Sequence, residues 1–151
     1  MRYPVDPLTH LLITRVACGR DRASLIAAVA PDLPFYATYP AWVLWSPVRR
    51  TRALQNDWPP APAWMTVPHH IVHSLPVLLV VALGLRWRHA TPYGTWPCWL
   101  FAWLLHILVD IPTHARRHWA PQFLWPCSTY TVDGVSWPVA LMGWVRRWRG
   151  R

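Results

Sequence analysis

Two apolar stretches, at residues 71–85 and 96–111, constrain the fold of this chain more than any other feature of its sequence. Each stretch with its flanks is about 17 to 19 residues long, which gives about 26 to 28 Å of helix, close to the lower limit for crossing the hydrocarbon core of a bilayer. A turn-forming TPYG sequence lies between them at 91–94. The sequence therefore predicts an antiparallel helical hairpin, with one helix over about 68–87 and the other over about 96–111.

The composition favours a membrane protein over a nucleic-acid-binding protein. Hydrophobic residues make up 54% of the 151 residues, and the net charge is +9 because all 15 basic residues are Arg and all 6 acidic ones are Asp. The Arg residues stand in short clusters at the edges of the apolar stretches, often beside one of the 13 Trp residues. Such flanks are typical of proteins that contact anionic lipid. The 3 cysteines form no C-x-x-C pair, which excludes a disulfide-stapled miniprotein and a Cys-rich zinc finger.

The rest of the chain predicts shorter helices joined by loops rich in Pro and Trp. Helices are expected over residues 7–18 and 21–30, each with an Asp in the capping position at its start. Proline clusters predict loops over 53–68 and 119–138, and residues 135–148 predict a short helix at the membrane surface. All 151 residues therefore form a single all-α domain in this prediction, a small membrane-embedded helical bundle around the central hairpin.

Histidine and aspartate residues inside the apolar stretches are the strongest functional signal. His69 and His73 are four residues apart on the first hairpin helix, and His106 and Asp110 are four apart on the second, so each pair shares one helix face. Counted from a turn near residue 91, His73 and Asp110 reach nearly the same depth because the rise per residue is constant. The two pairs therefore converge, as metal ligands do in helical bundles. Imidazoles and carboxylates without nearby Cys suit zinc, manganese or iron(II).

The same residues also have a structural interpretation. A single His on an apolar helix is usually a hydrogen-bonded core residue, and His106 with Asp110 is compatible with a structural pair. Neither His10 in the first predicted helix nor Asp32 after the second is remarkable alone. The alternative to a metal enzyme is a non-enzymatic integral membrane protein, a small transport or scaffold subunit whose His and Asp residues relay protons or fix helix packing. The joint pattern favours the metal site.

Five short motifs occur in an order that resembles a known family. They are Thr9-His10, PDLP at 31–34, HHIVHSL at 69–75, HILVDIPTH at 106–114 and FLWP at 123–126. Together they resemble the membrane-bound metal-dependent hydrolases, a family that includes a LexA-regulated inner-membrane protein, over most of the chain from residue 8 to 137. The resemblance implies a helical fold in the bacterial inner membrane and a ligand pattern similar to that of zinc-dependent phospholipase C.

By position in these motifs, the resemblance implies five metal ligands. They are His10, Asp32, His73, His106 and Asp110. This chain departs from the commoner family pattern, which has His and Arg where Pro68 and His69 stand here. Either His69 or His70 is therefore the candidate to replace the missing His, and His114 is a further candidate ligand.

A hydrolase of this kind has an expected mechanism. A bound divalent ion, zinc before manganese or iron, lowers the pKa of a coordinated water and polarises a phosphoryl or carbonyl oxygen. Asp32 is the candidate general base or bridging ligand, and the hydroxyls of Ser74 and Thr9 are candidates to orient neighbouring ligands. An Arg-rich rim favours an amphiphilic anionic substrate, a phospholipid or related phosphoester. The sequence does not indicate the oligomeric state.

The placement of Arg predicts the orientation of the hairpin in the membrane. Five Arg residues flank the histidine-bearing ends of the hairpin and two flank its tip. The five are Arg49, Arg50, Arg52, Arg116 and Arg117, and the two are Arg86 and Arg88. Because cytoplasmic flanks carry an excess of basic residues, the site is expected to face the cytoplasm.

Overall fold

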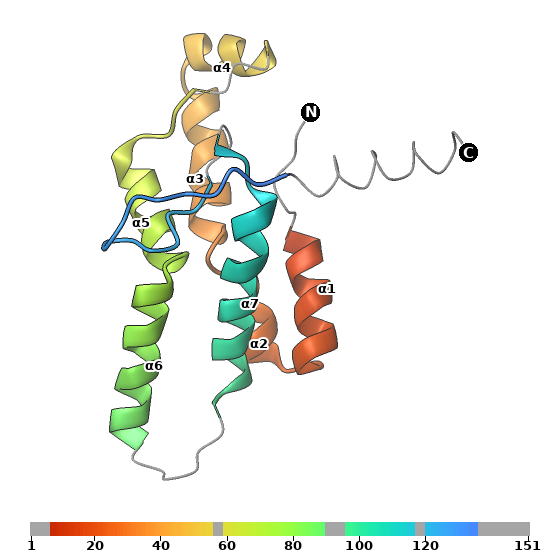
Figure 1. Ribbon diagram of the computed structural model, residues 1–151. Coiled ribbons are helices and arrows are strands. Elements are labelled where there is room, and N and C mark those ends of the chain that lie inside the picture. The colour runs from red at the N-terminus through yellow and green to blue at the C-terminus, as the bar shows by residue number, and fades with distance from the viewer. Residues whose placement is uncertain (1–6, 56–58, 90–95, 117–119, 136–151) are drawn as a thin grey trace, which may run out of the picture.

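The computed structural model describes residues 7–55, 59–89, 96–116 and 120–135, and within them the chain is all helical, with no strand (Figure 1). This confirms the predicted all-α class. The helices are α1 (Pro7–Cys18), α2 (Arg22–Ala27), α3 (Leu33–Leu44), α4 (Pro47–Leu54), α5 (Ala63–Val72), α6 (Leu75–His89) and α7 (Cys98–Thr113). The predicted surface helix at 135–148 falls, from residue 136 onward, outside the described residues.

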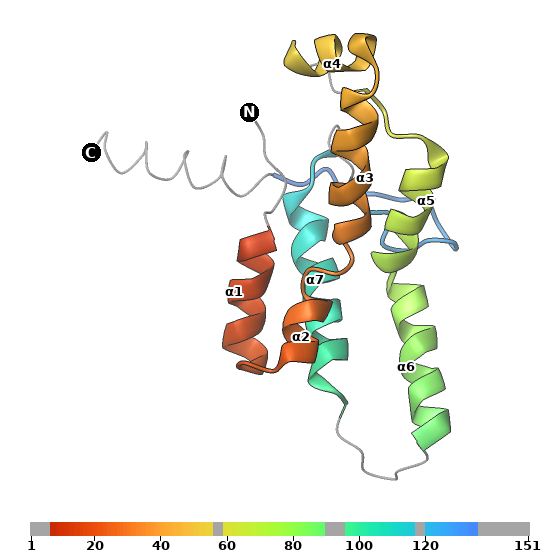
Figure 2. The same ribbon diagram turned by 180° about the vertical axis from the view of Figure 1, so that it is seen from behind.

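Helix α7 lies at the centre of the arrangement. It contacts α1, α2 and α6, whereas α3 contacts α4 and α5 (Figures 1 and 2). α6 and α7 run antiparallel, which confirms the predicted hairpin, and α4 lies across the outer end of α3. α7 ends at Thr113, slightly beyond the predicted end, because its helix accommodates Pro112.

The N-terminal helices form as predicted, with one boundary corrected. The carboxylate of Asp21 accepts a hydrogen bond from the backbone N–H of Ser24 at 2.9 Å, which is a normal N-cap. Gly19, at a φ of 70°, provides the left-handed turn after α1. α2 ends at Ala27, short of the predicted 30, because residues 28–32 tighten into turns that leave Asp32 at the start of α3.

The first hairpin helix is not continuous, which corrects the prediction of one helix over 68–87. α5 and α6 meet at His73 and Ser74 with a bend of 52°. Pro76 has no N–H to donate to the carbonyl four residues earlier, and its ring crowds that carbonyl, which favours a break at this point. Ser74 begins the new helix, because its hydroxyl oxygen accepts a hydrogen bond from the N–H of Val77 at 3.1 Å.

The predicted loop over 53–68 is also corrected. α4 continues to Leu54, and α5 begins at Ala63 and contains Pro68. The carbonyl of Pro62 accepts hydrogen bonds from the N–H groups of Met65 and Thr66, so the helix begins before Pro68. Because Pro68 has no N–H, the helix lacks one internal hydrogen bond at that residue. The sequence predicted neither α3 nor α4.

The segment at 120–135 has no helix, as predicted, and it fixes the bend between α5 and α6. The N–H of Leu75 donates to the carbonyl of Phe123 at 2.9 Å, and the hydroxyl of Ser74 donates to the carbonyl of Trp125. These bonds satisfy the backbone and side-chain groups that the break exposes.

Two apolar clusters leave a polar region between them. Phe35, Tyr39, Val43 and Met65 pack between α3 and α5. Leu78, Ala82, Leu100 and Ile107 pack between α6 and α7. Where the two clusters meet, the buried side chains are His and Asp.

The lengths and hydropathies of the described helices bear on whether any of them could cross a bilayer. Among the described residues, no single helix is both long and apolar enough to cross a bilayer, and α5 and α6 meet that test of length and composition only together, across their bend.

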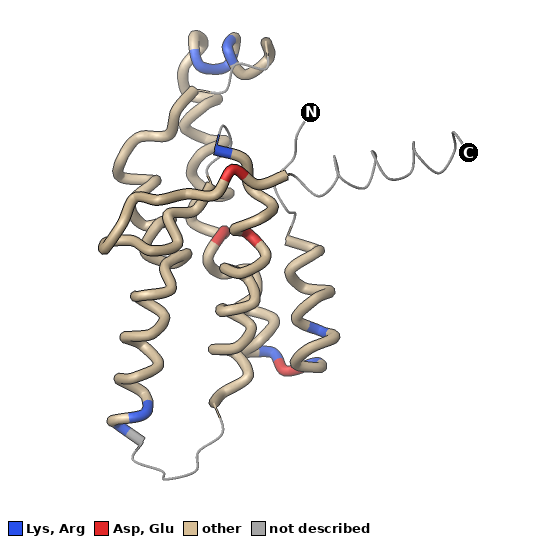
Figure 3. Tube along the Cα trace, viewed as in Figure 1, with Lys and Arg blue, Asp and Glu red and all other residues tan. Residues whose placement is uncertain are grey.

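Basic side chains mark both ends of the bundle (Figure 3). The turn between α1 and α2 lies at the same end as the hairpin tip, opposite α4, so Arg20 and Arg22 join Arg86 and Arg88 there. The prediction that the site faces the cytoplasm rested on an excess of Arg at one end. That excess was counted over the flanks of the hairpin alone, and the orientation stays a prediction.

Replacing Ser74 with Ala is expected to lower the free energy of unfolding by about 1 to 2 kcal/mol, because a buried cap and a buried carbonyl both lose their partner. Urea unfolding followed by circular dichroism measures this change. The matched control is Ser128→Ala, since the Ser128 hydroxyl accepts one exposed bond, from the N–H of Tyr130. If the two substitutions lower the free energy of unfolding equally, Ser74 does not stabilise the bend between α5 and α6.

Candidate metal centre

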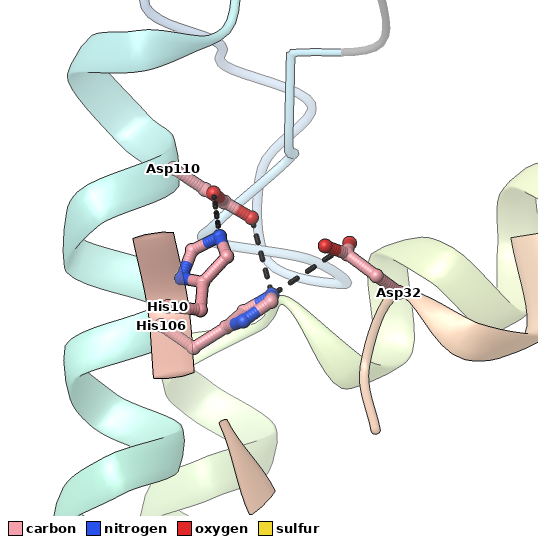
Figure 4. A group of neighbouring side chains, drawn as sticks. All are labelled: His10, Asp32, His106 and Asp110. Carbon is pink, nitrogen blue, oxygen red and sulfur yellow. Dashed lines mark ion pairs between the residues drawn. The ribbon is translucent and has the colours of Figure 1, made fainter. Parts of the chain in front are cut away.

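Five buried His and Asp side chains from four regions of the fold converge on one point. His10 comes from α1, Asp32 from the start of α3, His73 from the bend, and His106 and Asp110 from α7. Figure 4 shows four of them pointing toward one another. Each of the five is at most 5% exposed, which is rare for ionisable groups that lack a partner or a metal.

Asp110 is the hub of the cluster. One of its carboxylate oxygens lies 3.1 Å from Nε2 of His10, and the other lies 3.1 Å from Nε2 of His73 and 3.2 Å from Nε2 of His106. The contact between His73 and Asp110 confirms that the two hairpin helices bring these residues to the same depth. Asp32 closes the group, because its Oδ1 lies 3.3 Å from His73 and 3.7 Å from His106.

Backbone carbonyls fix the orientation of two imidazoles. Nδ1 of His106 donates to the carbonyl of Ala28 at 2.8 Å, and Nδ1 of His73 donates to the carbonyl of His69 at 2.8 Å. A carbonyl oxygen only accepts, so both Nδ1 atoms carry hydrogen and, in the neutral rings, both Nε2 atoms carry lone pairs. These carbonyls are the outer-shell partners typical of metal-binding histidines. These carbonyls could not be predicted from the sequence, because any residue supplies a carbonyl.

The arrangement of donor atoms favours a positive charge at the centre of the cluster. The Nε2 atoms of His73 and His106 lie 2.9 Å apart and both approach Asp110. Among the described residues, neither Asp110 oxygen accepts a hydrogen bond of ordinary geometry. Lone pairs and a carboxylate facing one another in a buried space require a cation, either a proton or a metal ion.

The donor atoms have the spacing of a metal site. The ligand atoms of His10, Asp32, His106 and Asp110 all lie within 4.8 Å of one another, and the closest contacts are near 3 Å. Donors about 2.05 Å from a tetrahedral zinc ion lie about 3.3 Å from one another. The residues present therefore fit a divalent ion in number, chemistry and spacing.

The position of Asp32 supports the same interpretation. Asp32 occupies the N-cap position of α3, where an Asp usually accepts a backbone hydrogen bond, yet its side chain makes no such bond. Its carboxylate faces His73 and His106 instead. The N-terminus of α3 favours the negative charge without using up the oxygens.

The remaining candidates lie around this group. His69 is buried and belongs to a second group with Asp32 and His73, whereas the half-buried His70 belongs to neither group. Nδ1 of His114, which ends α7, lies 3.5 Å from Oδ1 of Asp110.

The two candidate hydroxyls differ in their surroundings. The Ser74 hydroxyl contacts the Trp125 carbonyl and the Val77 N–H, so it holds the backbone beside His73. Thr9 is half-buried on α1 next to His10.

Burial and charge act in opposite directions on the protonation of Asp110 and His73. Burial raises the pKa of Asp110, but its contacts with His10, His106 and His73 outweigh burial and hold the pKa well below its usual value. Burial lowers the pKa of His73, but Asp110 and Asp32 raise it more, to about 9. In the metal-free protein at neutral pH, a proton on His73 thus supplies the missing positive charge.

Zinc binding at pH 7.5 is therefore expected to release a proton from His73, because a metal ligand must be neutral. Calorimetric titrations in two buffers of different ionisation enthalpy measure this release. The raised pKa also means that charged His73 stabilises the metal-free fold below about pH 6.5, by about 3 kcal/mol, and that this contribution is lost as the pH rises through 9. Thermal stability of the metal-free protein that stays constant from pH 6.5 to 9.5 contradicts this assignment.

No protein-family model, curated protein or solved structure matches this chain in the comparisons made.

Proposed function

We propose that this protein is a membrane-associated, metal-dependent hydrolase that acts on a phosphoester at the bilayer surface. The buried cluster of His10, Asp32, His106 and Asp110, whose donor atoms lie within 4.8 Å of one another and include unsatisfied atoms of His10 and Asp110, carries the proposal. Zinc suits this donor set best, and manganese and iron(II) suit it next. The family resemblance of the motifs supports the same activity.

The residues of the cluster have different roles in the proposed site. An ion bound here supplies a Lewis acid that polarises a phosphoryl oxygen and activates water. Asp110 holds His10 and His106 around the centre, and the Ala28 carbonyl keeps His106 in the tautomer that presents Nε2. Asp32, at the start of a helix, brings a carboxylate from the opposite side of the centre.

The surface of α1 supports contact with lipid. Its buried residues are His10 and Thr14, whereas Leu8, Leu12 and Val16 are 56% to 89% exposed along one face. A helix in a water-soluble protein normally has the reverse pattern, with apolar residues inside. The outward faces of α6 and α7 are also apolar. Exposed residues there include Leu79, Val80, Leu83, Phe101 and Leu108.

This apolar belt lies between the two basic ends of the bundle, an arrangement that suits a bilayer with anionic headgroups. We therefore propose the bacterial inner membrane as its location and a phospholipid-like phosphoester as its substrate class. Arg50 and Arg52, exposed on α4, are suited to attract such an anion.

The test is hydrolysis of bis(p-nitrophenyl) phosphate and of a chromogenic phospholipid in mixed micelles by purified, zinc-loaded protein. We expect hydrolysis that chelation abolishes and zinc restores, with the phospholipid preferred over the soluble ester. A His106→Ala, Asp110→Ala double variant with unchanged helicity is expected to be inactive. Wild-type protein that takes up no zinc and hydrolyses neither substrate in its presence contradicts the proposal and favours the non-enzymatic transport or scaffold subunit.

A further inference from the structure

We propose that the centre holds two divalent ions, with the second bound by Asp32, His69 and His73, and that Asp32 bridges the two. This inference rests on the proposed function, because it concerns the same site. It assigns a ligand role to His69, which stands where the resembled family commonly has Arg.

The environment of His69 is the first observation. Its side chain is buried, with 8% of the residue exposed, and neither ring nitrogen has a hydrogen-bond partner among the described residues. The ring lies against that of His73, with 3.9 Å between centroids, and the ring of Phe35 is 5.6 Å away on another side. A buried imidazole with an unsatisfied donor and acceptor is costly unless a ligand occupies it.

The distances within the second group are the next observation. One ligand atom from each of Asp32, His69 and His73 lies within 4.8 Å of the other two, as in the first group. Nδ1 of His73 is committed to the carbonyl of His69, so Nε2 is the atom that His73 offers. This contact orients the ring of His73, against which the ring of His69 lies, next to the bend.

Asp32 belongs to both donor groups, which makes it the candidate to bridge the two ions. A carboxylate has two oxygens and can therefore bind two ions at once, which the pairs of metals in phosphatases and nucleases commonly use. The first group offers four protein donors, so an ion there would take water or substrate as a fifth ligand. The second offers three, which leaves a position for substrate or water, as catalytic sites require. We assign Asp32 as the bridging ligand and not as the general base.

Two ions also define the substrate class more closely. A pair of metals stabilises both the attacking and the leaving oxygen of an in-line displacement at phosphorus. The open second position therefore fits a phosphodiester or phosphomonoester oxygen better than a carboxylic ester.

The experiment compares metal content and Mn²⁺ spectra of full-length wild-type, His69→Ala and His70→Ala proteins. We expect two zinc ions per chain in the wild type and in His70→Ala, the neighbour outside both groups, and one in His69→Ala. Manganese-loaded wild type is expected to show the spin-coupled signal of a bridged pair, and His69→Ala the signal of isolated Mn²⁺. Circular dichroism checks that the variants keep their helicity.

The outcomes separate this inference from the proposed function. One tightly bound ion per wild-type chain, or two in His69→Ala, overturns the second site and leaves the single-metal hydrolase standing. Wild-type protein that binds no ion overturns both. Because the wild-type stoichiometry is itself decisive, the test does not depend on the folding of a variant.

Discussion

Replacing Asp110 with Asn is expected to weaken zinc binding by more than about 100-fold, because it removes the charge of a proposed ligand, whereas loss of an outer-shell partner alone costs about 10- to 100-fold. Asp110 also approaches His10, His73 and His106 together. Asn keeps the shape and removes the charge, so the substitution also withdraws the anion that stabilises a proton on His73. The metal-free variant is expected to lose about 3 kcal/mol of stability, because removal of one partner leaves a buried charge uncompensated.

Asp133→Asn is the matched control. Asp133 is exposed, and its carboxylate accepts a hydrogen bond from the backbone N–H of Arg116 away from the centre. Isothermal titration with zinc and thermal unfolding measure both effects. Zinc affinity in Asp110→Asn within a few-fold of wild type refutes the role of Asp110 as the hub of a metal site.

The second large effect is expected when charges are placed on the apolar belt, the exposed apolar faces of α1, α6 and α7. Leu79 and Leu83 lie one turn apart on α6 and are 56% and 54% exposed. Each Arg placed at the centre of a lipid-facing helix costs about 3 kcal/mol, so the double change to Arg is expected to remove the protein from the membrane fraction. Immunoblotting of carbonate-washed membranes and of the supernatant measures this distribution.

The control places the same charges outside the belt. Val48 and Leu54 are 70% and 83% exposed on the basic helix α4, and their replacement with Arg is expected to leave the protein in the membrane fraction. Wild-type protein that is extracted by carbonate alone contradicts the lipid-facing belt, as does a Leu79→Arg, Leu83→Arg variant that stays membrane-bound.

The meeting of His73 and Asp110 could be predicted from the sequence because it depends only on helix rise and on the position of one turn. The helices α1 and α2 could be predicted from local signals, which include Pro7 at the start of α1, Gly19 after it and the capping Asp21 of α2. The other expected cap, Asp6, lies outside the described residues. Local rules of this kind act within one or two turns of helix, where the residues that matter are neighbours in sequence.

The bend at His73 depends on distant residues and could not be predicted in this way. Pro76 permits a break, but the carbonyls of Phe123 and Trp125 hold it. Of His69 and His70, His69 is the one that lies in a donor group, together with Asp32 and His73. No helix was predicted at α3 or α4, and the Pro-rich loop predicted over 53–68 covers the first part of α5. Packing between α3 and α5 maintains these two helices despite Pro40 and Pro68.

The zinc K-edge absorption spectrum of the zinc-loaded protein tests the central claim most directly. The structure predicts a first shell of nitrogen and oxygen alone, at about 2.0 to 2.1 Å, with the outer-shell scattering of several imidazoles. None of Cys18, Cys98 and Cys127 belongs to either donor group. A sulfur shell at about 2.3 Å, or a shell of water oxygens without imidazole, contradicts a metal centre built from His10, Asp32, His106 and Asp110.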